Sequence, residues 1–220
     1  GGDDSGDTGG NNSGNDGDED AHHATPRHMS ISIAIDHKGT MRKRARVRGS
    51  IYVADGYGNH LVVVFDNEGK YLRQWGSPGT GPGQFAAEGG GHPHCVTLGN
   101  DSLVYVCDRG NARAKVFDGV GALQRIIPIE PEGFSYQPLR TNDIAFSTDP
   151  EQSFFYTSDV GSGTVWILNR TTGRIAGGIG GMGQRAGHFI GVHTMGVDSK
   201  GNLYVSEGGG GRRTQKFVRQ

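Results

Sequence analysis

The chain has 220 residues, of which 40 are glycine, and hydrophobic residues make up only 33% of it. The chain has only eight prolines and its glycines show no three-residue period, which excludes a collagen-like chain. It has no run of 18 apolar residues, which argues against a transmembrane segment. A net charge of −1 gives the whole chain no general attraction to nucleic acid or to acidic membranes. So much glycine among valine, isoleucine and aromatic residues predicts short strands joined by tight turns.

The N-terminal segment differs from the rest. Residues 1–20 hold seven glycines, seven acidic residues, three asparagines and three hydroxyl residues. Because this stretch has no apolar surface to bury, we expect residues 1–30 to form a disordered acidic tail rich in Gly, Asp and Asn, with His22 and His23 belonging to it. The tail resembles the linkers that follow the lipidated cysteine of bacterial lipoproteins, which indicates a secreted or cell-envelope protein. Its oxygen-rich side chains make Ca²⁺ a weak alternative ligand, since no Asp-x-Asp-x-Asp-Gly spacing is present.

A basic segment follows, with five Lys or Arg residues between positions 42 and 48. We interpret it as a solvated insertion loop, with a polyanion-binding patch as the alternative. No aromatic residue lies between these basic residues, so bases have no stacking platform and we expect no nucleic-acid partner.

From residue 51 onward the chain repeats itself. Segments 51–66, 104–118, 155–169 and 203–218 each contain alternating β-formers, an acidic residue, a Gly- or Asn-rich turn and a second strand. The acids recur at intervals of 53, 51 and 48 residues, at Asp55, Asp108, Asp159 and Glu207. A period near 50 with several short strands per unit is typical of propeller blades. We therefore expect residues 31–220 to form an all-β propeller with about four visible blades, either a four-bladed ring or part of a larger one.

The two cysteines lie in one hairpin of the second unit. If its turn is at Gly99 and Asn100, Cys95 and Cys107 point to opposite faces of the sheet. We therefore expect buried free thiols rather than a disulfide.

The repeats resemble NHL repeats and, more narrowly, the peptidyl-α-hydroxyglycine α-amidating lyase family and its exported bacterial relatives. The motifs that carry the resemblance are VADGYGNHLVVVFD, WGSPGTGPGQF, HPHCVTLGNDSLVYVCDRGNARAKVFD and VHTMGVDSKGNLYVSEGGGGRRTQKFV. The resemblance implies a six-bladed NHL-type propeller with Zn²⁺ held on its axis by three histidines. It also implies cleavage of a peptidyl-α-hydroxyglycine into a peptide amide and glyoxylate.

Matched motif by motif, the resemblance makes Tyr57 the catalytic base, Arg109 a substrate-binding residue, and His94 and His193 metal ligands. The spacing agrees for the histidines, because His94 lies 14 residues before its blade acid and His193 lies 14 residues before its own. Two side chains at one position of two different blades can both face the axis. Zinc bound by three protein ligands keeps a fourth position for water or substrate.

The third histidine of the family has no counterpart here. The equivalent positions in the first and third units fall near Ile31 and Asn142, and His92 is an alternative ligand. Thr194 stands where the family has an acid associated with a structural Ca²⁺.

Our leading hypothesis is an exported zinc-dependent, lyase-like β-propeller that cleaves a carbon–nitrogen bond in a peptidyl-α-hydroxyglycine or a similar small carbinol. Its partner is then a small-molecule or peptide substrate. One alternative is a non-catalytic NHL propeller that binds a protein, a glycan or a polyanion. Another is a structural subunit that assembles with copies of itself through exposed sheet edges.

Overall fold

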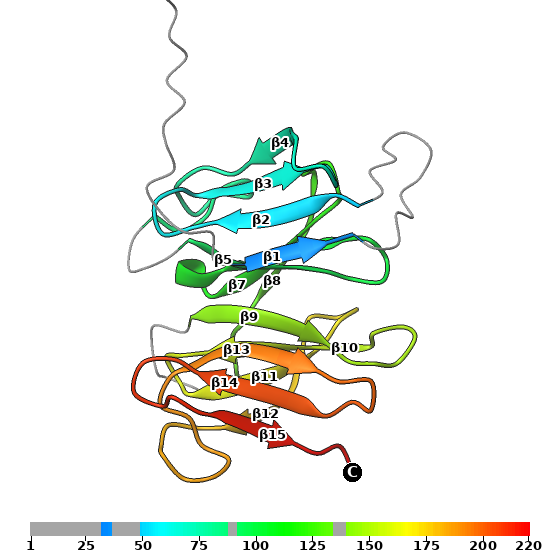
Figure 1. Ribbon diagram of the computed structural model, residues 1–220. Coiled ribbons are helices and arrows are strands. Elements are labelled where there is room, and N and C mark those ends of the chain that lie inside the picture. Colours follow the sequence, from blue (N-terminus) through cyan, green and yellow to red (C-terminus); the bar gives the residue numbers. More distant parts are fainter. Residues whose placement is uncertain (1–31, 37–48, 88–91, 134–139) are drawn as a thin grey trace, which may run out of the picture.

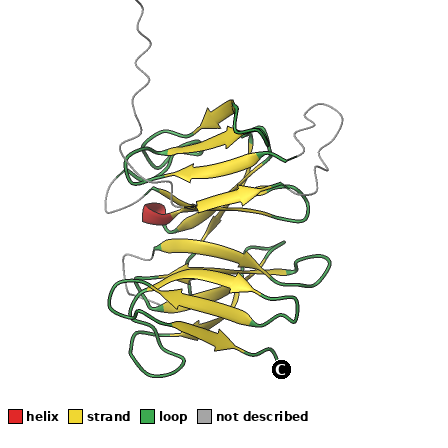
Figure 2. Cartoon of the chain, in the orientation of Figure 1, coloured by secondary structure: helices red, strands yellow, loops and turns green. Residues whose placement is uncertain are grey.

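A computed structural model describes residues 32–36, 49–87, 92–133 and 140–220. The expected acidic tail, including His22 and His23, and the basic segment 42–48 lie outside the described residues. Within these ranges the chain folds as strands and turns, with one short helical turn, η1 (Arg109–Asn111), seen in Figure 2. No helix in the described part of the chain has the length and apolarity needed to cross a membrane.

The strands form four antiparallel sheets, which we call blades 1 to 4 (Figure 1). Blade 1 consists of β1 (Ser32–Ile35), β2 (Ile51–Asp55), β3 (Leu61–Phe65) and β4 (Tyr71–Trp75). Blade 2 consists of β5 (Pro93–Leu98), β6 (Val104–Asp108), β7 (Arg113–Phe117) and β8 (Leu123–Pro128). Blade 3 consists of β9 (Thr141–Phe146), β10 (Phe154–Asp159), β11 (Thr164–Asn169) and β12 (Ile175–Gly180). Blade 4 consists of β13 (Val192–Val197), β14 (Leu203–Glu207) and β15 (Thr214–Phe217).

Alternating side chains explain why these segments form sheets that pack on each other. In β2 and β3 every second residue is buried, and the buried set includes Tyr52, Ala54, Val62 and Val64. Three buried apolar clusters fill the spaces between blades 1 and 2, blades 2 and 3, and blades 3 and 4. The first strands of the blades, β1, β5, β9 and β13, contact one another in that order. The prediction of an all-β propeller is therefore confirmed, with four blades in sequence around a common axis (Figure 1).

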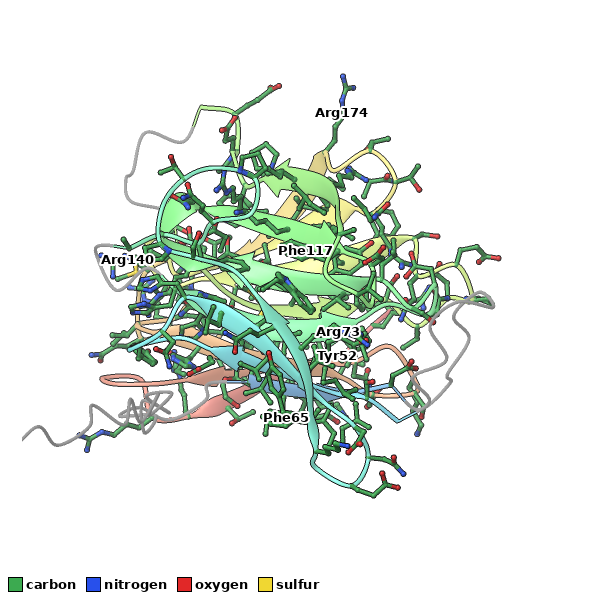
Figure 3. All side chains as sticks on the ribbon, turned by 90° about the horizontal axis from the view of Figure 1, so that it is seen from above. Tyr52, Phe65, Arg73, Phe117, Arg140 and Arg174 are labelled. Carbon is green, nitrogen blue, oxygen red and sulfur yellow. A yellow bond between two sulfur atoms is a disulfide. The ribbon has the colours of Figure 1, made fainter. Side chains whose placement is uncertain are left out.

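Polar contacts reinforce the apolar joint between the first two blades. The Tyr52 hydroxyl and the Arg73 guanidinium, neighbours in Figure 3, both donate to the Gly119 carbonyl, at 3.3 Å and 2.8 Å. Burial is the main reason that the pKa of Tyr52 is raised above its ordinary value, so its hydroxyl stays protonated and remains a donor.

The repeated acids end the second strand of every blade, and three of them accept a hydrogen bond from the backbone of the segment that enters their blade. Asp108 accepts from Ala86 N at 2.9 Å and Asp159 accepts from Arg140 N at 2.7 Å. Glu207 accepts from Ile190 N at 2.7 Å. The recurrence of an acid in each unit therefore has a structural cause, because the carboxylate ties the incoming segment to the end of the second strand.

The prediction of free thiols is wrong, because Cys95 and Cys107 form a disulfide with a Cα–Cα distance of 4.9 Å. The error lies in the register of the hairpin. Leu98 pairs with Val104, so five residues form the connection instead of a two-residue turn at Gly99 and Asn100. Continuing this register brings Cys95 opposite Cys107, on the same face of the sheet.

Candidate functional site

Four residues from three blades meet at one end of the axis. Tyr57 lies in the turn after β2, His94 is the second residue of β5, Arg109 opens η1 after β6, and His193 is the second residue of β13. The Tyr57 hydroxyl lies 3.4 Å from Nε2 of His94 and accepts a hydrogen bond of 3.4 Å from Nη1 of Arg109. The ring centres of His94 and His193 are 4.9 Å apart. All four candidate site residues of the sequence analysis thus lie in one cluster.

Hydrogen bonds set the orientation of the two metal-ligand candidates. Nδ1 of His94 lies 2.7 Å from the backbone oxygen of Asn142, so its N–H donates there and Nε2 keeps its lone pair. Nδ1 of His193 lies 3.2 Å from Oγ1 of Thr194, which again leaves Nε2 for another partner. In metal-binding histidines one ring nitrogen commonly makes a hydrogen bond that orients the ring, and the other nitrogen binds the metal.

The site also keeps these imidazoles neutral. Burial lowers the pKa of His94 to about 4, which outweighs the opposing hydrogen bond to Asn142. Burial, together with the charge of Arg109, also lowers the pKa of His193. Neutral imidazole is the form that binds a metal ion, so both side chains are ready for this role near pH 7.

The geometry fits two ligands of a zinc site. Two imidazoles that share a tetrahedral zinc at Zn–N distances of about 2.0–2.1 Å have ring centres roughly 5 Å apart. The observed separation of His94 and His193 is 4.9 Å. Within the described ranges, no group of three or more His, Cys, Asp or Glu residues gathers in a way that could hold a metal. Asn142, at the equivalent position of blade 3, contacts His94 only through its backbone oxygen.

A second pair of histidines, His60 and His92, lies near Tyr57. The ring centre of His92 is 5.0 Å from that of Tyr57 and 5.7 Å from that of His60. His92 has φ of 137° and Tyr57 has φ of 48°, both in the region that side chains other than glycine rarely adopt. Such strained residues cluster at functional sites. The sequence pattern marks His92 only as an alternative metal ligand. It does not point to His60, because no other blade has a histidine at the equivalent position of the repeat.

Two charged residues, Arg109 and Asp143, have shifted pKa values. Burial lowers the pKa of Arg109, while its contact with Tyr57 opposes the shift. Arg140, labelled in Figure 3, lies close enough to Arg109 to repel it electrostatically. Asp143 in β9 accepts hydrogen bonds from Met195 N at 2.7 Å and Ile144 N at 2.9 Å, and burial raises its pKa to about 6. The sequence alone predicts no role for Asp143, because the identity of a polar residue in a strand does not indicate which face of the sheet it occupies.

Comparisons with known proteins agree with the fold and with the resemblance. A family model described as a 6-bladed beta-propeller matches residues 42–88. The chain is 40% identical over 72 residues to NHL repeat-containing protein 3 of Homo sapiens, covering 32% of this chain and 19% of that protein. It is 36% identical over 74 residues to the peptidyl-glycine alpha-amidating monooxygenase of Mus musculus, covering 31% of this chain and 7% of that protein. The chain thus spans less than a fifth of these curated relatives and resembles both NHL-repeat and α-amidating proteins.

Two longer solved chains share the fold of this chain. The Kuenenia stuttgartiensis hydrazine synthase aligns with a TM-score of 0.53 at 12% identity, over 86% of this chain and 49% of that one. The virginiamycin B lyase from Staphylococcus aureus aligns with a TM-score of 0.51 at 14% identity, over 78% of this chain and 53% of that one. At such low identity these alignments speak for the fold alone.

Proposed function

We propose that this chain is an exported, zinc-dependent, lyase-like β-propeller that acts on a peptidyl-α-hydroxyglycine or a similar small carbinol. The observation that carries the proposal is the meeting of Tyr57, His94, Arg109 and His193 at one end of the axis. These residues lie far apart in the sequence, and each matches a functional residue of the α-amidating lyase family that the chain resembles. The sequence identity to an α-amidating monooxygenase supports the same class of substrate.

His94 and His193 are the residues that would hold the metal, each through Nε2. Bound there, zinc would supply Lewis-acid polarisation of the substrate hydroxyl. Thr194 orients His193 and the Asn142 carbonyl orients His94.

The remaining chemistry belongs to the chain's own residues. Tyr57, as the phenolate, accepts the proton of the carbinol hydroxyl, and the freed electron pair forms the carbon–oxygen double bond of glyoxylate as the carbon–nitrogen bond breaks. The departing amide nitrogen takes up one proton, so the reaction needs no oxidant or reductant. Arg109, 3.4 Å from the Tyr57 hydroxyl, stabilises the phenolate charge and binds the substrate carboxylate.

The disulfide supports the proposed location. Cys95 and Cys107 are almost fully buried and bonded within one blade. Stable disulfides are rare in reducing cytosol and common in secreted or cell-envelope proteins. Export is therefore consistent with the chemistry of this hairpin.

Metal content per chain tests the proposal directly. We expect about one zinc in the purified protein and its loss in both His94→Ala and His193→Ala, with exposed His188→Ala as the matched control. Tyr57→Phe should keep the zinc and lose the release of glyoxylate from an N-acyl-α-hydroxyglycine. No zinc, or zinc unaffected by either ligand variant, would reject the catalytic proposal. A non-catalytic or self-assembling propeller would then be the better interpretation, and exposed Ile33 and Ile35 of β1 would be examined by measuring oligomeric state.

A further inference from the structure

Three buried nitrogen atoms near Tyr57 have no hydrogen-bond partner in the described part of the chain. They are Nε2 of His60, Nδ1 of His92 and Nε of Arg109. Buried polar atoms in folded proteins are nearly always paired, so an unpaired one calls for a bound group to satisfy it. Three of them close together indicate a bound ligand that supplies what the described residues do not.

These atoms belong to one compact arrangement. The ring centres of His60 and His92 are 5.7 Å apart, and the backbone N–H of Arg109 donates to the His92 carbonyl at 3.3 Å. His92 is 8% exposed and is held at φ of 137°, a backbone conformation that costs energy for any residue except glycine. The fold therefore keeps the His92 imidazole beside Arg109 and Tyr57 at the expense of local strain.

We propose that His60, His92 and the Nε side of Arg109 form a binding subsite for a small carboxylate. A guanidinium Nε–H can only donate, and each imidazole can present an N–H at its unpaired nitrogen. The fixed positive charge of Arg109 favours an anion at this place. One water accepts only two hydrogen bonds, whereas a carboxylate has about four acceptor positions and can serve all three donors.

This subsite rests on the proposed function and deepens it, because it adds His60 and His92 to Arg109 as residues that bind the substrate carboxylate. Its histidines are different residues from the proposed metal ligands His94 and His193, and the subsite requires neither zinc nor turnover. In a substrate it would bind a carboxylate, and in the free protein it would bind the same group in a small organic acid.

The test uses the full chain freed of metal by a chelator. Sodium acetate is titrated against sodium chloride at equal ionic strength, and binding is followed through the imidazole NMR signals. We expect saturable acetate-specific shifts of two histidine signals, one of which is absent in His60→Phe and the other in His92→Gly. Acetate binding should weaken about tenfold in each variant, as for the loss of one charge-assisted hydrogen bond, and stay unchanged in the exposed control His188→Phe.

Equal shifts with chloride, or acetate binding unaffected by both variants, would overturn the proposal. Binding of inorganic phosphate in place of acetate would overturn the assignment to a carboxylate. His60→Phe provides a second measurement if His92→Gly does not fold. Because the titration is made without metal, acetate binding is decided separately from the zinc and glyoxylate measurements that test the lyase proposal.

Discussion

The backbone of His92 offers the sharpest test of how the site is built. His92 is buried at φ of 137°, a conformation open to glycine but strained by roughly 1–3 kcal/mol for other residues. His92→Gly and His92→Ala both remove the imidazole and its ring contact with Tyr57. They differ in one respect, because alanine keeps the Cβ that makes the conformation costly and glycine does not.

The difference between these variants follows from two opposing contributions. Relief of strain favours glycine by roughly 1–3 kcal/mol, and the greater freedom of glycine in the unfolded chain opposes it by about 0.5–1 kcal/mol. We therefore expect the free energy of unfolding of His92→Gly to exceed that of His92→Ala by about 1 kcal/mol. For a chain of this size the corresponding difference in Tm is about 2–4 °C.

Equilibrium unfolding in urea, monitored by tryptophan fluorescence, measures this difference. Both variants should lose acetate binding to a similar extent, since both lack the imidazole. If His92→Ala is as stable as His92→Gly or more stable, the backbone at this position is not strained. The use of backbone strain at His92 as evidence for a functional site would then be refuted.

Three further predictions concern the disulfide and the acids Asp108 and Asp143. Reduction of the Cys95–Cys107 disulfide, which closes a sequence separation of 12 residues, should lower the free energy of unfolding by about 2–4 kcal/mol, as measured by thermal unfolding with and without reductant. Asp108→Asn should cost about 3–5 kcal/mol in urea unfolding, because it leaves fully buried Lys115, now 3.4 Å from the carboxylate, without its counter-charge. Burial raises the pKa of Asp143 from 3.8 to about 6, so the contribution of Asp143 to the free energy of unfolding should rise as the pH falls from about 6 to 4, against the loss that His94 contributes there because its pKa is lowered to about 4. Asp143→Asn should remove that rise, and an unchanged pH profile of unfolding would contradict the assignment.

The fold was predictable because the same sequence repeat occurs in every blade. Asp108, Asp159 and Glu207 each end a strand and each receive a backbone N–H, so one requirement recurs at a regular interval in the sequence. The pairing of Cys95 with Cys107 was not predictable in the same way. It depends on the length of one hairpin connection, and a change from a two-residue to a five-residue connection reverses which side chains share a face.

The same contrast separates the two halves of the candidate site. His94 and His193 were predicted because they occupy one position in two blades, and the first strands of a propeller all run beside the axis. Equal positions in the repeat therefore become neighbours in space, here with ring centres 4.9 Å apart. His60 and His92 break the repeat, since each occurs in one blade only, so no comparison between units points to them. Their distinguishing features are visible only in the structure. Each has a buried ring nitrogen without a partner among the described residues, both lie near Arg109, and the backbone of His92 is strained. A sequence repeat thus identifies functional residues that occupy the same position in several blades and meet at the axis. A binding residue that occurs in one blade only has to be found in the structure, from buried polar atoms without partners.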